Sequence, residues 1–288
     1  MSRFQVLLAS LCFGTTGTAQ ALGPAGLSPA GVGAARILIG GALLVLVALL
    51  ADGLRGLPRR PLLLAAAAVA AYQLSFFAAV ADTGVAVGTI VALGSAPALA
   101  GALEWLVERR APTRAWAIAT ALACAGVAML ALAGADASIS VLGVALALVA
   151  GASYAGYTYA AKQMLQAGHT PERVMAGAFG LGAVVLLPVL FITGAEWLAT
   201  TDGLLLAVFL GVVPTAGAYL LFARGLKRLS AAETATLTLA EPLTATLLGV
   251  IVLSEALNAP AAVGAALILS GLLVLAAPEV RRPVTVPA

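Results

Sequence analysis

Charged residues are scarce in this sequence of 288 residues. Asp, Glu, Lys and Arg together make up 9% of it, whereas hydrophobic residues make up 62% and the mean hydropathy is +1.09. A soluble domain of this length would carry about 25% charged residues. The scarcity therefore excludes a soluble protein and predicts an all-α integral membrane protein whose helices cross the lipid bilayer several times.

Cysteine and histidine are also rare. Cys12 and Cys124 fall in separate apolar stretches and His169, the single histidine, falls in a loop. We therefore expect no disulfide framework, no metal site and no cofactor. No GxxxxGK[ST] loop is present, which excludes ATP binding by that motif. The net charge of +3 does not indicate a nucleic-acid partner, because the basic residues lie in short loops between apolar stretches.

Apolar stretches long enough to cross a bilayer recur along the whole chain. Short loops rich in Pro, Gly and Ser separate them, and no stretch fits a soluble domain. We expect ten membrane-spanning helices, at roughly 5–22, 32–51, 61–81, 85–107, 115–133, 140–161, 174–194, 203–223, 232–254 and 260–277.

The basic residues give these spans an orientation. If the N-terminus is cytoplasmic, every basic residue except Arg36 falls at a cytoplasmic loop or terminus. The charged residues of the outer loops are all acidic, for example Asp82 and Asp202. This asymmetry follows the positive-inside rule. It predicts a multi-pass protein of the inner (plasma) membrane with both termini in the cytoplasm.

The chain contains an internal duplication. A shift of 145 residues superposes stretch 86–133 on stretch 231–278; it pairs Ala86 with Ala231, Thr89 with Thr234, Pro97 with Pro242, Gly126 with Gly271 and Leu130 with Leu275. Each half, 1–136 and 137–288, holds an odd number of spans, so the second half must be inverted relative to the first. Inverted repeats are typical of secondary transporters, which bind solute near the bilayer midplane where the repeats meet.

These features resemble the drug/metabolite transporter superfamily and, within it, the ten-helix EamA type. The resemblance is carried by Ser28-Pro29 and Ala35-Arg36 at the entry to the second span, by Glu241-Pro242, by the polar hinges 108–112 and 255–260, and by the tail 261–277. Within the family the chain most resembles the YddG-type exporters of aromatic amino acids. The resemblance implies a central cavity lined by spans one, three, four, six, eight and nine.

Glu241 is the sharpest functional candidate. It lies about nine residues into its span, roughly 13 Å deep at 1.5 Å per residue, and so near the middle of a hydrocarbon core of about 30 Å. An ionisable side chain there is costly and indicates function, such as proton coupling. A structural interpretation stays open, in which a protonated Glu241 donates to the carbonyl that Pro242 leaves free. No glutamate precedes Pro97, so any role of Glu241 belongs to the second repeat alone.

Aromatic and hydroxyl side chains on the same spans are the other candidates. The rings could stack on an aromatic or cationic solute and the hydroxyls could bind it, although packing or lipid contact explains such residues equally well. The predicted substrate-binding residues are Phe13, Thr16, Tyr72, Phe76, Phe77, Thr89, Tyr154, Tyr157, Tyr219, Thr238 and Glu241. Pro97 and Pro242 are predicted gating kinks, with a simple packing kink as the alternative.

Basic residues are almost absent from the depth of the spans. Arg36 is the exception, and we expect it to play a structural part, by snorkelling to the interface or by pairing with a carboxylate or carbonyl. A solute with phosphate groups would require more basic residues, so nucleotide sugars and triose phosphates are disfavoured. Neutral, zwitterionic or cationic solutes are favoured.

The sequence therefore predicts a secondary transporter, not an enzyme. It would export small metabolites, aromatic or other neutral amino acids first, by alternating access. The alternatives are a multidrug or quaternary-cation exporter and, from different classes, a lipid flippase or an intramembrane enzyme. The expected partners are a small-molecule solute and the lipid bilayer; a monomer is plausible, and the sequence leaves the oligomeric state open.

Overall fold

The structure is a computed structural model that describes residues 1–51, 53–109, 111–132, 140–254 and 258–276. Throughout these ranges the regular structure is helical and no strand occurs. The predicted boundary between the halves at 136/137, the hinge residue Glu255 and the basic residues Arg110, Arg281 and Arg282 lie outside the described residues.

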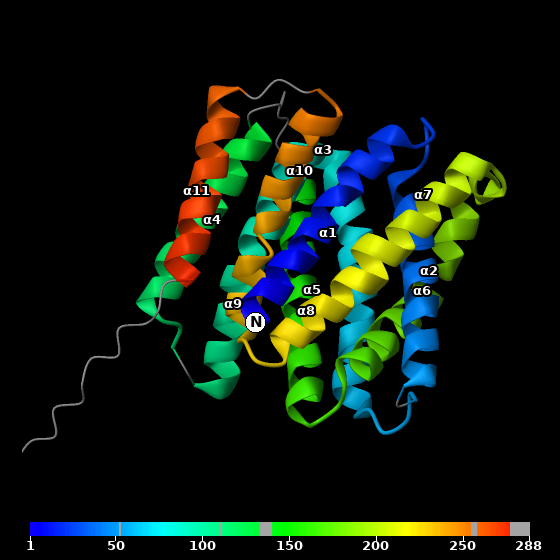
Figure 1. Ribbon diagram of the computed structural model, residues 1–288, viewed down its shortest axis with the longest axis horizontal. Helices are drawn as coiled ribbons and strands as arrows, with labels where there is room; N and C mark the ends of the chain where they lie inside the picture. Colours follow the sequence, from blue (N-terminus) through cyan, green and yellow to red (C-terminus); the bar gives the residue numbers. More distant parts are fainter. Residues whose placement is uncertain (52, 110, 133–139, 255–257, 277–288) are drawn as a thin grey trace, which may run out of the picture.

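The helices form one bundle (Figure 1). They are α1 (Ser2–Leu22), α2 (Pro29–Leu50), α3 (Arg59–Glu108), α4 (Arg114–Leu132), α5 (Val141–Gln166), α6 (Pro171–Ile192), α7 (Thr201–Gly211), α8 (Ala218–Leu226), α9 (Ala231–Leu237), α10 (Ala240–Val252) and α11 (Ala259–Ala276). A 3-10 turn, η1 (Glu196–Ala199), precedes α7, and a π-helical turn, η2 (Val212–Gly217), joins α7 to α8.

Eight helical segments in the described residues are long and apolar enough to cross a membrane. They are α2, the two halves of α3 (Arg59–Gly84 and Val87–Glu108), α5, α6, Thr201–Leu226, Ala231–Val252 and α11. The apolar part of α4, Arg114–Leu130, is shorter. These segments support a multi-pass membrane protein. That α1 and α4 also cross, to give ten spans, stays a prediction.

Local sequence explains where many helices begin. At five helix starts a hydroxyl side chain accepts the backbone N–H three residues later and so satisfies a donor that has no partner within the helix. These caps are Ser28, Ser140, Thr170, Thr200 and Ser230. Pro29 and Pro171 follow two of them at the first helical position, where a missing N–H costs nothing.

The loop predicted between the third and fourth spans is reduced to one residue. Helix α3 runs from Arg59 to Glu108 and departs from helical geometry at Gly84, with φ 80° and ψ 162°. Only glycine adopts this backbone conformation without strain. Asp82, expected in an outer loop, is exposed on α3 instead, where its carboxylate accepts a hydrogen bond from the Ser140 hydroxyl.

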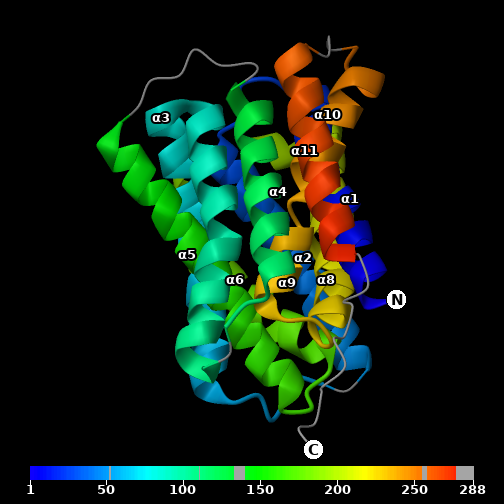
Figure 2. The ribbon, with the colours of Figure 1, turned by 90° about the vertical axis from the view of Figure 1, so that its left-hand side faces the viewer.

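Helices that are far apart in the sequence lie side by side. Figures 1 and 2 show α4 beside α11, and α2 packs on α6 and α3 on α5 in the same way. Helices α4 and α11 approach closely because Gly126 faces Gly264: a Cβ atom added to Gly264 would lie 2.7 Å from the Gly126 carbonyl oxygen. Small residues allow such backbone contact between membrane helices.

Candidate substrate cavity and its closed end

A cavity opens in the middle of the bundle, between α1, α2, α3, α5, α6, α8, α9 and α10. It consists of three adjoining lobes that share Tyr72, and two of them also share Phe13, Arg36 and Glu241. The largest lobe has a volume of about 270 Å³. We call the three lobes together the central cavity.

All of the predicted substrate-binding residues line the central cavity. The lining includes Phe13, Thr16, Tyr72, Phe76, Phe77, Thr89, Tyr154, Tyr157, Tyr219, Thr238 and Glu241. Their role in binding stays a prediction. The predicted gating residues Pro97 and Pro242 are not among the residues that line it. Helix α2 also contributes, through Arg36 and Ile37, although the resemblance did not place its span around the cavity.

Aromatic side chains form a continuous cluster along the cavity. Two aromatic pairs share a helix face, four and three residues apart: Tyr72 stacks on Phe76 with ring centroids 5.6 Å apart, and the ring centroids of Tyr154 and Tyr157 lie 6.1 Å apart. Tyr219 joins them to Phe13 at 4.9 Å. Tyr157 is only 3% exposed, so it forms part of the packed core as well as the wall of the smallest lobe.

Arg36 projects into the cavity and does not snorkel to the surface. Its Nη2 donates to Oε1 of Gln73 at 3.3 Å, and the Gln73 amide is held in turn by the Gly33 carbonyl at 3.2 Å. The Nε of Arg36 is buried and has no hydrogen-bond partner among the residues that the structure describes. Sequence reasoning missed Arg36 and Gln73 as cavity residues. The available signal was that Arg36 is the single basic residue outside the charged loops.

Glu241 lines two of the three lobes, and its carboxylate has no hydrogen-bond or ion-pair partner among the described residues. The structural interpretation required it to donate to the carbonyl of Thr238, which Pro242 deprives of its usual donor. That carbonyl accepts the backbone N–H of Glu241 instead, at 2.9 Å. The predicted structural bond is therefore absent, and the carboxylate is left facing the cavity.

The backbone beside Glu241 is interrupted. Thr238 and Leu239 form a turn between α9 and α10, with ψ of −13° and −4°. Hydrogen bonds from other helices hold this turn: the Ser10 hydroxyl reaches the Leu237 carbonyl at 3.3 Å, and the hydroxyls of Tyr154 and Thr238 lie 3.1 Å apart. The predicted kink at Pro242 is thus a break in the helix, four residues before the proline.

Comparison with known proteins identifies the fold family. The family model of the EamA-like transporter family matches residues 2–132 and 141–277. The chain belongs to this family. It is 43% identical over 274 residues to "Uncharacterized transporter YwfM" of Bacillus subtilis (strain 168), a match that covers 94% of this chain and 92% of that protein.

Two further comparisons are less extensive. An "Uncharacterized transporter" of Archaeoglobus fulgidus is 35% identical over 134 residues, which covers 46% of this EamA-like transporter and 47% of the relative. A protein of known crystal structure superposes with a TM-score of 0.82 over 95% of each chain, at 23% identity. At that identity the likeness concerns the fold alone.

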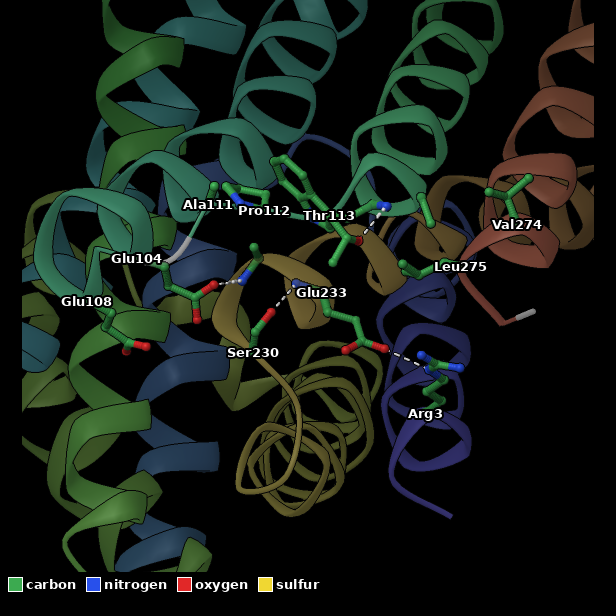
Figure 3. A pocket seen from close by; sticks show the side chains of 13 residues that line it. Arg3, Glu104, Glu108, Ala111, Pro112, Thr113, Ser230, Glu233, Val274 and Leu275 are labelled. Carbon is green, nitrogen blue, oxygen red and sulfur yellow. Dashed lines mark hydrogen bonds and ion pairs between the residues drawn. The ribbon is translucent and has the colours of Figure 1, made fainter. Parts of the chain in front are cut away.

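The EamA-like transporter also has a vestibule at one end of the bundle, where α1 and α9 begin and α3 ends (Figure 3). We call this the basic end, because Arg3, Arg114 and Arg224 lie at helix termini there. The vestibule has a volume of about 290 Å³ and acidic walls, which include Glu104, Glu108 and Glu233.

Helix α9 separates the vestibule from the central cavity. Ala232 and Glu233 of α9 line the vestibule, whereas Ala235, less than one turn further, lines the cavity. Ala235 is buried against Ala100 of α3 and Ala155 of α5. The seven residues of α9 therefore form a plug at this end of the cavity.

Two charged side chains hold α9 in place. Glu104 is 8% exposed; its carboxylate accepts the N–H groups of Ala231 and Ala232 at 2.5 and 3.2 Å, and the second of these bonds is drawn in Figure 3. Lys162, expected in a loop, is 6% exposed within α5. Its Nζ donates to the carbonyls of Leu226, Lys227 and Leu229, which lead into α9. At the rim, Arg3 pairs with Glu233 at 2.6 Å.

Proposed function

We propose that the chain is a secondary transporter that exports small metabolites, aromatic or other neutral amino acids first, across the inner membrane. The observation that carries this proposal is the lining of the central cavity. It combines a cluster of aromatic rings, threonine hydroxyls, one guanidinium and one carboxylate. Ligand sites of this kind are mostly apolar, with a few polar groups that fix the orientation of the ligand.

Alternating access accounts for the closed end. The plug formed by α9 separates the central cavity from the vestibule, and the break at Thr238–Leu239 leaves α9 as a separate short helix that can move as a unit. We propose that α9 closes the cytoplasmic side in this state and moves aside in the inward-facing state. Interrupted helices beside the solute site are a recurring feature of secondary transporters.

We also propose that ten helices cross the membrane as two inverted repeats, 1–136 and 137–288. The superposition by 145 residues supports this arrangement, as does the match of the family model to two segments of similar length. We propose that both termini are cytoplasmic; the basic residues at the end of the bundle where α1 begins support this orientation.

One specific observation favours a second candidate, export of quaternary or multidrug cations. The unpaired carboxylate of Glu241 shares its lobe with the rings of Phe13, Tyr72 and Tyr219, and carboxylates and aromatic faces both attract cations. No feature of the described residues favours a lipid flippase or an intramembrane enzyme over these two candidates.

Counterflow in liposomes tests the proposal. Purified protein is reconstituted with an excess of unlabelled solute inside, and uptake of labelled phenylalanine, threonine or a quaternary ammonium cation is measured. Empty liposomes and liposomes loaded with sucrose serve as controls. Saturable phenylalanine counterflow is expected. Flux of the cation alone would favour the second candidate, and no saturable flux of any solute would contradict transport of this class.

A further inference from the structure

We infer that Arg36 and Glu241 bind the two charged ends of one zwitterion, with Arg36 at its carboxylate and Glu241 at its ammonium group. The largest lobe of the central cavity, which Phe76 and Phe77 line, receives the side chain of the solute. This inference rests on the proposed function and deepens it, because it names the part of the solute that each residue recognises.

The two charges are placed to act together. Arg36 from α2 and Glu241 from α10 line the same two lobes, and they are the charged side chains of that lining. They form no salt bridge with each other in the structure. A buried charge that forms no salt bridge is costly, so each of these groups gains from a ligand of opposite charge. A solute that carries both charges and has no net charge satisfies both groups at once.

The environment of Arg36 suits a carboxylate. Gln73 accepts a hydrogen bond from one guanidinium nitrogen at 3.3 Å and holds the side chain in place, while the buried Nε has no partner in the described part of the chain. A guanidinium presents several donors in a fixed planar fork, which matches the two oxygens of a carboxylate. Buried donors are nearly always hydrogen-bonded in native proteins, so the free Nε indicates a ligand that supplies the missing acceptor.

The environment of Glu241 suits an ammonium group. Its carboxylate has no hydrogen-bond or ion-pair partner among the described residues and lies in the lobe that Tyr72 and Tyr219 line. An ammonium group can donate to the carboxylate while the ring faces add a cation–π attraction. The Thr238 hydroxyl in the same lobe offers a further acceptor.

The largest lobe, with a volume of about 270 Å³, has room for an apolar side chain. Phe76, Phe77 and Val32 line it beside Arg36 and Glu241. Discrimination then follows from the unpaired charge that an incomplete solute leaves behind. An amine without a carboxylate leaves Arg36 unpaired, and an acid without an amine leaves Glu241 unpaired; sites that hydrogen-bond a solute group reject analogues that lack it.

A binding experiment with three ligands tests this division of roles. Phenylalanine, phenethylamine (no carboxylate) and 3-phenylpropionate (no amine) are titrated against the purified wild type, Arg36→Gln and Glu241→Gln. The Arg36→Gln change is expected to weaken phenylalanine and 3-phenylpropionate by about 10- to 100-fold and to spare phenethylamine. Glu241→Gln is expected to weaken phenylalanine and phenethylamine to a similar extent and to spare 3-phenylpropionate.

Matched controls separate this effect from a general loss of charge. Arg224→Gln and Glu172→Gln neutralise an ion pair outside the central cavity and are expected to leave all three affinities unchanged. If Arg36→Gln does not fold, Arg36→Lys keeps the charge but not the planar fork, and should weaken only the two carboxylate ligands.

The outcomes distinguish the inference from the proposed function. Equal weakening of all three ligands by each variant would overturn the inference, as would wild-type protein that binds phenethylamine as tightly as phenylalanine or binds no phenylalanine. Selective binding without flux in liposomes would contradict transport and leave the inference standing. Phenylalanine flux without ligand-selective effects of the variants would support transport and overturn the inference.

Discussion

Two segments of equal length show how the halves of the molecule differ. The first is Val87–Glu108, the second part of α3, and the second is Ala231–Val252, which contains α9 and α10. Each has 22 residues and contains one of the two prolines, Pro97 and Pro242, that the shift of 145 residues pairs. The helix around Pro97 is continuous up to Glu108. The helix before Pro242 is broken at Thr238–Leu239. A proline in the sequence is therefore not sufficient to break a helix here.

The threonines of the second segment explain why its helix is broken while that of the first segment is continuous. The hydroxyls of Thr234, Thr236 and Thr238 bond back to carbonyls three or four residues earlier, at distances of 2.7 to 3.0 Å. Such bonds compete with the helix ladder and bend helices. In the described part of the first segment only the Ser95 hydroxyl donates back to its own helix near Pro97, to the Ala92 carbonyl at 3.3 Å. The break frees α9 as a plug and brings Thr238, Leu239 and Glu241 to the cavity.

The largest loss of stability is expected from a substitution where the two segments meet. Glu104, near the end of the first, accepts two N–H groups at the start of the second. Glu104→Ala should leave these buried donors unpaired and reduce the free energy of unfolding by about 3 kcal/mol. Equilibrium unfolding in mixed detergent micelles measures this loss. Glu108→Ala, an exposed residue of the same vestibule, is the control and should change the stability by less than about 0.5 kcal/mol.

Opening of the plug should accompany that loss of stability. A cysteine at Ala235, in a background where Cys12 and Cys124 are replaced by Ala, should react faster with a membrane-impermeant thiol reagent when Glu104 is Ala. Unchanged reactivity would mean that Glu104 stabilises the fold without controlling access to the cavity.

The next largest effect is a change in transport rate, which compares the two prolines directly. Pro242→Ala restores an N–H that competes for the Thr238 carbonyl and favours a continuous helix through the break. We expect the initial rate of phenylalanine counterflow to fall about tenfold, which corresponds to about 1.4 kcal/mol. Pro97→Ala should change the rate by less than about twofold, because the helix around it is already continuous. Equal effects of the two changes would show that the break is not part of the transport cycle.

The smallest effect concerns the place where α3 does change direction. Gly84→Ala puts a Cβ atom on a residue with φ 80° and should cost about 1 kcal/mol of stability. Gly94→Ala, at a helical position with open space around it, should stabilise the protein by about 0.5 kcal/mol. Thermal unfolding of both variants in one detergent measures the contrast, and a stabilising Gly84→Ala would contradict the described turn.

Sequence reasoning reached the membrane class, the family and the lining of the central cavity. It succeeded there because the scarcity of charge is a property of the whole chain, and because deep aromatic and hydroxyl residues stand out against Ala and Leu. It failed at Lys162 and Glu104, which look like solvated helix ends. Their partners are backbone groups 64 to 128 residues away, and such contacts leave no local pattern.

Arg36 and Pro242 show a second kind of limit. The role of Arg36 depends on Gln73 and on the unpaired Glu241, which only the packing of α2, α3 and α10 brings together. The break near Pro242 depends on the threonines before it and on the Ser10 hydroxyl from α1. Periodicity and depth could locate these residues, but they could not predict their partners.

The most direct test of the central claim is equilibrium binding of labelled phenylalanine to the purified protein and to the double variant Arg36→Gln/Glu241→Gln. If the central cavity is the solute site, the wild type binds phenylalanine saturably with one site per chain. The double variant, whose folding is checked by its thermal unfolding curve, then shows no saturable binding. A folded double variant that binds phenylalanine as tightly as the wild type would contradict the account.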